Sequence, residues 1–322
     1  MGMLRLKATM IGTLAAIIGL STLFFTVVLA LLNVFDFWLL GIFVVGFNFL
    51  QWLIAPYLID AMYRVRKITK VEEPELYRTV ERISQRSNIK IPEIVVARIP
   101  IPNAFAYGSP LTGKKVAVTT GLLDTLDAEE VEAVIGHEIG HLKHRDVQVM
   151  MFASILPALF YYIGYSLVWS SALGRRDDRG SGGLMAIIGL ASILFYWILT
   201  LFTLYLSRLR EYYADRHSTS VVDDGSRKLS EGLAKIAYST EMARKTRKYK
   251  TNMSSMKSLF ISDPDTVATD AREMAQIGMS RSDRELVERY LNRKISSGDR
   301  LIEIFSTHPN MVKRLRTLQE SG

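Results

Sequence analysis

The sequence predicts a mainly α-helical membrane protein with about four transmembrane helices and a polar α+β part that carries a small β-sheet. The mean hydropathy is positive and hydrophobic residues make up 49% of the 322 residues, which argues against a wholly soluble protein. Four long segments contain no Asp, Glu, Lys or Arg, whereas the segments between and after them are polar and show helix and strand patterns.

The four charge-free segments are residues 8–35, 37–59, 147–174 and 180–207. Each is long enough to cross a bilayer as a helix, which takes about 20 apolar residues. The alternative, a buried helix of a soluble protein, rarely extends beyond about 20 residues without charge. The first segment is too long, and too closely followed by the second, for a cleaved signal peptide. With Asn33 and Asp36 marking a turn, residues 1–63 are predicted to form one membrane hairpin and residues 147–207 a second.

Basic residues next to the membrane segments predict which side each end faces, because short cytoplasmic loops are enriched in Lys and Arg. They precede the first segment and follow the second and fourth: Arg5, Lys7, Arg64, Arg66, Lys67, Lys70, Arg208 and Arg210. The polar parts, residues 64–146 and 208–322, are therefore predicted to lie on the cytoplasmic side of the cell membrane. The loop 175–183 is predicted to lie outside, although it carries three arginines.

The net charge of +8 is consistent with two kinds of partner. A nucleic-acid-binding protein gathers its charge on a soluble face together with aromatic residues. Much of the positive charge here flanks membrane segments, so the lipid bilayer is the expected partner and nucleic acid is not. The absence of cysteine excludes disulfides and any thiolate metal site.

The polar parts predict a few helices and a small sheet. Helices are expected over residues 73–86, 226–243 and 283–293, and strands over residues 93–99, 104–107 and 115–120. Asp127 followed by Glu130 resembles a capping box that opens a further helix, which has no obvious stop signal before the third membrane segment. The basic run 244–250 and the Met- and Ser-rich residues 252–257 predict a solvated loop or, alternatively, a flap that contacts lipid or substrate.

The stretch VIGHEIGHLKH (residues 134–144) places two histidines four residues apart, with a glutamate directly after the first. On an α-helix such residues share one face, so His137 and His141 can direct ring nitrogens at one zinc ion. Glu138 is rotated from that line and can take the proton of an attacking water. The stretch matches the H-E-x-x-H pattern of metal hydrolases. The alternative is an ordinary helix face with hydrogen-bonded histidines.

A catalytic zinc ion usually has three protein ligands, so a third must come from elsewhere. Position 147 is Val, which excludes the extended metzincin pattern. A second membrane hairpin returns the chain to its starting side. His141 then lies roughly 9 Å from the membrane entry at Val147, and Glu211 roughly 6 Å beyond the exit at Ser207. Glu211 is therefore the predicted third ligand, whereas Asp177 and Asp178 would lie on the opposite side.

Asp215 follows Glu211 by one helical turn in SRLREYYAD (residues 207–215). A carboxylate at this place is expected to hold a ligand histidine in the tautomer that binds metal. The alternative is an exposed acid that pairs with Arg208 or Arg216. His144 shares the ligand face but lies beyond tetrahedral reach, and His217 is predicted to be a surface residue.

HEIGH followed by EYYAD across a hydrophobic hairpin resembles the HtpX-type membrane zinc metalloproteases of the M48 family. The segments PNAFAYG, VAVTTGLLDTL, HLKHRD and STHPNMVKRLRTL also resemble family segments in the same order, so the resemblance covers essentially the whole chain. Four hydrophobic segments fit this type better than the many-spanning CAAX prenyl proteases of the family.

The resemblance implies a zincin-like α+β protease domain that faces the cytoplasm and acts in membrane-protein quality control and stress response. It implies that His137, His141 and Glu211 bind one Zn2+ and that Glu138 is the general base. Asn103, Ala104 and Phe105 belong to a strand that could pair with an extended substrate or, alternatively, form a hairpin in the core. His308, in THPN, matches a His-Pro position of the family and is either close to the developing oxyanion or a helix-start histidine.

The leading hypothesis is thus a membrane-anchored zinc endopeptidase that cleaves membrane proteins or peptides. One alternative is a CAAX-type protease that trims a lipidated C terminus. The other is a non-proteolytic membrane scaffold or chaperone with a structural zinc ion. A structural site has no use for a base beside an open coordination position, so the presence of Glu138 favours the enzyme.

Overall fold

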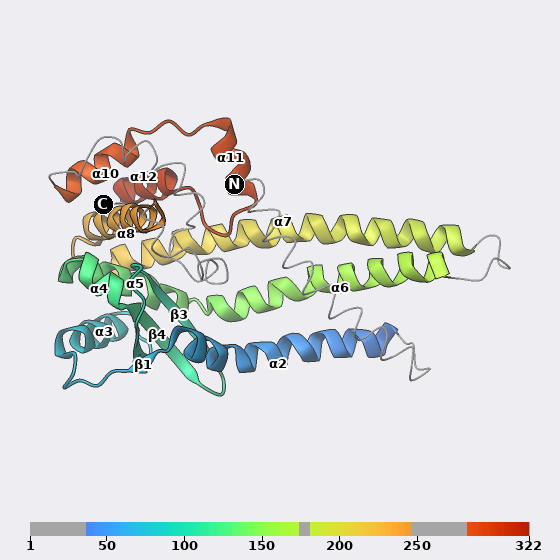
Figure 1. The fold of residues 1–322 in the computed structure, drawn as a ribbon, viewed down its shortest axis with the longest axis horizontal. Coiled ribbons are helices and arrows are strands. Elements are labelled where there is room, and N and C mark those ends of the chain that lie inside the picture. The colour runs from blue at the N-terminus through green and yellow to red at the C-terminus, as the bar shows by residue number, and fades with distance from the viewer. Residues whose placement is uncertain (1–36, 174–180, 246–281, 322) are drawn as a thin grey trace. The chain divides into compact units, whose positions relative to one another are not determined.

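The structure is a computed structural model that describes residues 37–173, 181–245 and 282–321, and these residues are mostly helical with one small sheet (Figure 1). The elements are α2 (Phe37–Tyr63), β1 (Arg66–Lys67), α3 (Pro74–Arg86), β2 (Glu93–Ala97), β3 (Ala104–Ser109), β4 (Gly113–Thr119), α4 (Thr120–Thr125), α5 (Ala128–Lys143), α6 (Asp146–Leu173), α7 (Ser181–Val221), α8 (Gly225–Lys245), α10 (Asp283–Leu291), α11 (Ser297–Ile304) and α12 (Met311–Ser321).

Contacts divide the chain into two compact units. The apolar unit comprises the described residues of Met1–Trp52 and Gln148–Leu204, and the polar unit those of Leu53–Val147 and Tyr205–Gly322. The finer four-part division predicted from the sequence, at residues 63, 146 and 207, stays a prediction.

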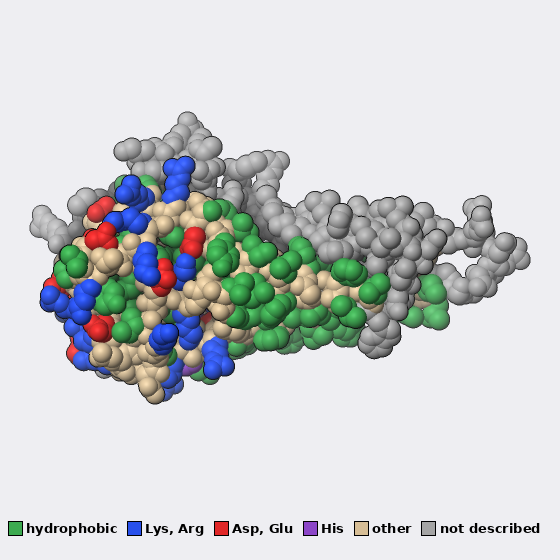
Figure 2. Space-filling model, turned by 90° about the horizontal axis from the view of Figure 1, so that it is seen from below, with side chains coloured by type: hydrophobic (Ala, Val, Ile, Leu, Met, Phe, Trp, Pro, Cys, Tyr) green, Lys and Arg blue, Asp and Glu red, His purple; other side chains and the backbone are tan. Residues whose placement is uncertain are grey.

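Three helices of the described residues are long and apolar enough to cross a membrane: Gly41–Tyr63, Asp146–Ser171 and Gly183–Val221. They match the second, third and fourth segments predicted from the sequence, while the first, residues 8–35, lies outside the described residues. Apolar side chains such as Ile42 and Leu58 are 68% and 58% exposed on α2, and its surface is largely apolar in Figure 2. An exposed apolar helix surface of this kind is typical of a segment in lipid.

Within the apolar unit, α6 and α7 pack closely where both carry glycine. A Cβ added to Gly164 would lie 2.7 Å from the Gly189 carbonyl oxygen, so only small residues allow this approach. Close packing at small residues is how membrane helices associate, because lipid gives no hydrophobic drive between them. The rings of Phe160 and Phe195 stack at 5.7 Å beside it.

In the polar unit, four strands form a mixed sheet in the order β1-β2-β4-β3. β2 pairs parallel with β4, and β3 pairs antiparallel with β4, with Ala104 opposite Val118 and Ser109 opposite Gly113. β3 is therefore an edge strand among the described elements. The predicted strands are each found within a few residues of their expected bounds.

The helix α5 packs against β3 and β4, and α3 and α8 pack against α5. The apolar side chains of α5, among them Val134, Ile135 and Ile139, are fully buried in the main core. Asp127 and Glu130 form the predicted capping box at the start of α5. Burial of this helix on several sides fixes the position of the motif that it carries.

The prediction that the motif helix runs on toward the third membrane segment is wrong. α5 ends at Lys143, and α6 begins anew at Asp146. Between them Arg145 has a φ of 57°, in the left-handed region that ends helices and that non-glycine residues seldom adopt. In contrast, α7 continues without a break from the fourth membrane segment to Val221, so its last turns carry Glu211 and Asp215.

The predicted helices over residues 73–86, 226–243 and 283–293 correspond to α3, α8 and α10. Pro74 occupies the first turn of α3, where its missing N–H has no partner to lose. The larger part of the basic and Met-rich stretch 244–257 lies outside the described residues.

Candidate metal centre

The centre is formed where α5 lies very close to the last turns of α7. A Cβ on Gly140 would lie 3.1 Å from the Cα of Ala214, and one on Gly136 would lie 2.9 Å from Ser218 Oγ. Ser218 Oγ in turn donates to the Ala133 carbonyl at 2.6 Å. The two glycines of HEIGH and its preceding turn therefore let the backbones approach, and Glu211 and Asp215 are brought against the two histidines.

Three side chains direct donor atoms at one point. His137 Nε2 and His141 Nε2 are 3.1 Å apart, and each lies 3.6 Å from an oxygen of Glu211. Ligand atoms held about 2.1 Å from one tetrahedral ion are about 3.4 Å apart. The separations of 3.1 to 3.6 Å thus match a three-ligand zinc site.

The other ring nitrogens of both histidines contact carboxylates. His137 Nδ1 lies 2.8 Å from Asp215 Oδ1, and His141 Nδ1 lies 2.6 Å from Asp146 Oδ2. Asp146 accepts a hydrogen bond from His141 Nδ1–H, and Asp215 contacts Nδ1 of His137. A proton on Nδ1 beside each carboxylate leaves the lone pair of each ring on Nε2, facing the common point. Two lone pairs that face each other repel unless a cation lies between them, which favours a metal at this place.

The charges of the centre also call for a dication. Glu138, Glu211, Asp215 and Asp146 are all at most 4% exposed, and buried charges are paired with opposite charges or coordinate metals. Only two guanidinium groups contact these carboxylates in the described part of the chain, those of Arg314 and Arg210. With all four carboxylates ionised, the four negative and two positive charges leave an excess of two negative charges, which Zn2+ would neutralise.

Arg314, from α12, is fully buried and binds both carboxylates of α7. Its Nη2 and Nε lie 2.6 and 2.9 Å from the two oxygens of Asp215, and its Nη1 lies 3.3 Å from Glu211 Oε2. Such a two-pronged contact fixes the carboxylate in orientation as well as in charge. The C-terminal helix is thereby joined to His137 through Asp215. The alternative that Asp215 pairs with Arg208 or Arg216 does not match these contacts.

Glu138 lies beside the two histidines, with ligand atoms of all three within 4.8 Å of one another. Burial raises the pKa of its carboxyl, although the two histidines and a backbone hydrogen bond from Ala106 act in the opposite direction. A raised pKa suits a group that must accept and return a proton near neutral pH. Glu211 is the better ligand of the two carboxylates because its oxygens face both Nε2 atoms.

His308 and the β3 strand both border the centre. His308 Nε2 is 3.8 Å from Glu211 Oε1, and its side chain precedes α12 instead of lying inside it. Asn103 bonds to β4 through its backbone, since its carbonyl accepts from the Thr119 N–H at 2.9 Å. Because alternate residues of a strand face opposite edges, Ala104 and Ala106 direct their backbone groups to the open edge, and Phe105 faces β4.

The remaining histidines lie outside the centre. His144 is exposed at the end of α5. His217, predicted to be a surface residue, is half-buried, and its Nε2 is 2.8 Å from Ser87 Oγ. The sequence patterns predict no role in the centre for Asp146, Arg210 or Arg314. HLKHRD and STHPNMVKRLRTL contain the first and the last of these, but no local pattern shows that residues so far apart meet.

Comparison with known proteins gives matches over most of the chain. Residues 70–321 match the model of peptidase family M48. Among relatives, the chain is 39% identical over 288 residues to a protease HtpX homolog of Thermoplasma acidophilum, covering 88% of this chain and 84% of that protein. It is 40% identical over 272 residues to the Aeropyrum pernix homolog, covering 83% and 81%.

The fold also resembles a solved membrane-protease structure, that of S. mikatae Ste24p. The TM-score is 0.53 at 16% sequence identity, and the match covers 98% of this chain and 67% of the other. This likeness concerns the fold alone. Together with the family match and the apolar helices, the sequence identities show that the chain belongs to peptidase family M48, as an HtpX-like membrane protease.

Proposed function

We propose that this chain is a zinc-dependent endopeptidase that cleaves misfolded or damaged membrane proteins at the cytoplasmic face of the cell membrane. The observation that carries the proposal is the convergence of His137 Nε2, His141 Nε2 and the Glu211 carboxylate at separations of 3.1 to 3.6 Å. In this proposal these three side chains hold zinc, and Asp215 and Asp146 hold the two histidines in the correct tautomer.

When bound, zinc supplies a Lewis acid that polarises the scissile carbonyl and makes water more acidic. Glu138 takes the proton of the attacking water and passes it to the leaving amine. Its buried carboxyl is held by the Ala106 N–H, next to the edge of β3 on which an extended substrate would pair. His308, beside Glu211, is placed to donate to the developing oxyanion.

Glu138→Gln is expected to retain zinc and to lose cleavage of a membrane-protein substrate by about 10²-fold or more, because the amide cannot accept the proton. Metal content and cleavage would be measured on the full chain in detergent or proteoliposomes. Glu129→Gln changes an exposed acid on the same helix and serves as the control. Undiminished cleavage by Glu138→Gln would favour a scaffold or chaperone with structural zinc.

The zinc affinity is expected to decrease as the pH falls. The decrease should begin above the pH range in which histidine ordinarily titrates. Burial lowers the pKa of His141, but the hydrogen bond to Asp146 and the charges of Glu211 and Glu138 raise it by more. Since only neutral imidazole binds metal, the metal-free site holds the extra proton and affinity rises with pH, by up to about tenfold per unit. Competition with a chromophoric chelator between about pH 6 and 8 measures this, a range that starts near the ordinary histidine pKa and extends above it.

Asp146→Asn removes the charge while keeping an acceptor for His141. The pH dependence should shift to lower pH, and affinity above the histidine range should fall by about 10 to 100-fold because the ring loses its oriented, charged partner. Asp223→Asn, an exposed aspartate of the polar unit, is the matched control. Identical titration curves for Asp146→Asn and the unmodified chain would contradict the role of this contact.

Peptide substrates with single N-methylated amides test the proposed pairing on β3. A substrate strand bonded to the open edge uses the backbone groups of alternate residues, so cleavage should be lost at every second methylated position around the scissile bond. Peptides methylated at the intervening positions are built-in controls. Uniform loss at all positions, or no loss, would show that the substrate backbone does not add to the sheet.

The orientation rests on the basic residues that flank the membrane segments. Because the chain has no cysteine, single substitutions Gly182→Cys and Val71→Cys report on one site each. An impermeant maleimide should label Gly182→Cys on intact cells, and Val71→Cys, 90% exposed in the polar unit, only after lysis. Labelling of Val71→Cys from outside would reverse the assignment.

A further inference from the structure

The turn between α5 and α6 links a proposed zinc ligand to the side chain that holds it. His141 lies in the last turn of α5, and Asp146 is the first residue of α6. The left-handed backbone of Arg145, at a φ of 57°, brings Asp146 Oδ2 to within 2.6 Å of His141 Nδ1. Residues with a Cβ seldom adopt this conformation, so the turn depends on contacts around it.

Three cations gather around this turn without an acidic partner. Lys143 and Arg145 flank it in sequence, and Lys114 of β4 reaches it from the sheet, where its Nζ donates to the Leu142 carbonyl at 2.9 Å. All three residues are exposed. Burial and then the charges of Arg145 and Lys143 lower the pKa of Lys114, which shows that the three charges repel one another. In the described part of the chain, none of the three forms an ion pair.

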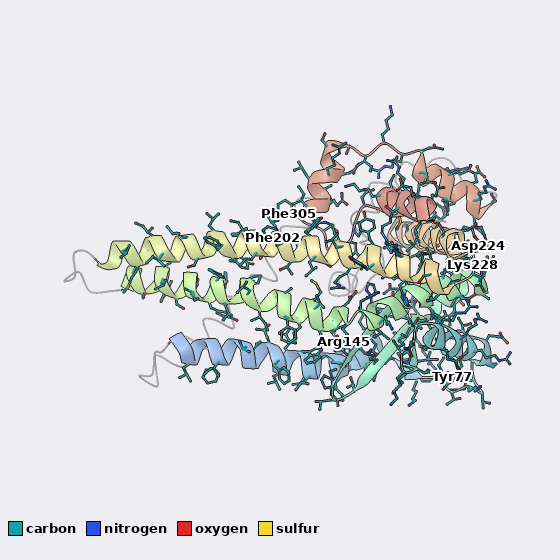
Figure 3. The ribbon with its side chains drawn as sticks, turned by 180° about the vertical axis from the view of Figure 1, so that it is seen from behind. Tyr77, Arg145, Phe202, Asp224, Lys228 and Phe305 are labelled. Carbon is teal, nitrogen blue, oxygen red and sulfur yellow. The ribbon has the colours of Figure 1, made fainter. Side chains whose placement is uncertain are left out.

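The same turn adjoins residues expected at the membrane surface. The candidate span Asp146–Ser171 begins directly after Arg145 (Figure 3). The tip of the hairpin that carries Lys114 holds Leu111, which is 63% exposed. At the end of a membrane helix, an exposed leucine can contact acyl chains, and cations without ion-pair partners can bind anionic headgroups.

We propose that Lys114, Lys143 and Arg145 form a binding site for the headgroup of an anionic phospholipid, and that the bound headgroup holds the α5–α6 turn. The phosphate would neutralise the repulsion among the three cations. It would thereby favour the turn conformation that keeps Asp146 on His141. This second step rests on the proposed function, because it makes zinc retention depend on the surrounding lipid.

The binding step is tested with the full chain in nanodiscs, using Glu138→Gln so that no cleavage interferes. The triple variant Lys114→Gln, Lys143→Gln, Arg145→Gln is compared with a matched triple, Lys90→Gln, Arg98→Gln, Arg300→Gln, whose three cations are exposed elsewhere in the polar unit. Phosphatidylglycerol retained on the protein is measured by native mass spectrometry. Each cation near an anionic membrane contributes about fivefold, so the first triple should lose roughly a hundredfold in apparent affinity and the matched triple little.

Equal retention of phosphatidylglycerol by both triples would overturn the binding site. Binding of inorganic phosphate is the second test. If inorganic phosphate in detergent bound at Lys114, Lys143 and Arg145 as tightly as the lipid headgroup does, the site would be one for soluble anions, and the proposed lipid site would also be overturned. Neither result depends on whether the chain is a protease, so a failure here is distinct from a failure of the proposed function.

The coupling step is tested by zinc loss to a chelator from the otherwise unmodified chain. Nanodiscs of phosphatidylcholine alone are compared with nanodiscs in which roughly a quarter of the lipid is phosphatidylglycerol. We expect zinc loss to slow several-fold with phosphatidylglycerol, and this slowing to persist in the matched triple and vanish in the first triple. A triple variant that loses the lipid but keeps the slowing would overturn the coupling.

Discussion

The close approach of α5 to the end of α7 is the contact on which the centre depends. A ligand pair on one helix cannot complete a site alone. The third proposed ligand, the carboxylate of Glu211, comes 70 positions after His141, beyond a long apolar hairpin. Gly136 and Gly140 leave no Cβ in the interface, so Ala214 and Ser218 can lie against the α5 backbone. With larger residues on α5, Glu211 would be held too far from the two ring nitrogens for a shared ion.

That approach concentrates charge in a place where water cannot screen it. Four buried carboxylates next to two imidazoles are unstable without positive charge, and the chain supplies part of it from distant segments. Arg314 of α12 offsets one of the two negative charges on the α7 carboxylates, and Arg210 contacts Asp146 at 3.2 Å. The remaining negative charge is what gives the centre its affinity for a dication. Removing one arginine would therefore disturb the metal as well as the fold.

How much of this the sequence predicts depends on whether a feature is local. The histidine pair, the capping box at Asp127 and the strands follow from patterns within a few residues. Glu211 could be predicted as the third ligand because a membrane hairpin constrains where the chain returns. The role of Arg314 could not be predicted, since its helix has an ordinary amphipathic pattern and its partner Asp215 is 99 residues away. The helix break at Arg145 contains neither Gly nor Pro, so no residue type there predicts it. Because the break was not predicted, the contact of Asp146 with His141 was not predicted either.

The break at Arg145 also changes what the membrane can do for the centre. A continuous helix would have directed Asp146 one turn past His141 and away from Nδ1, and the membrane would have been an anchor only. Because the chain turns there, a carboxylate that orients a ligand histidine is the first residue of a candidate membrane helix. Any force on that helix end, from lipid headgroups or from its packing, acts on Asp146, whose carboxylate contacts His141. The proposed zinc ligand His141 and the start of the candidate membrane helix are thus separated by one turn of backbone.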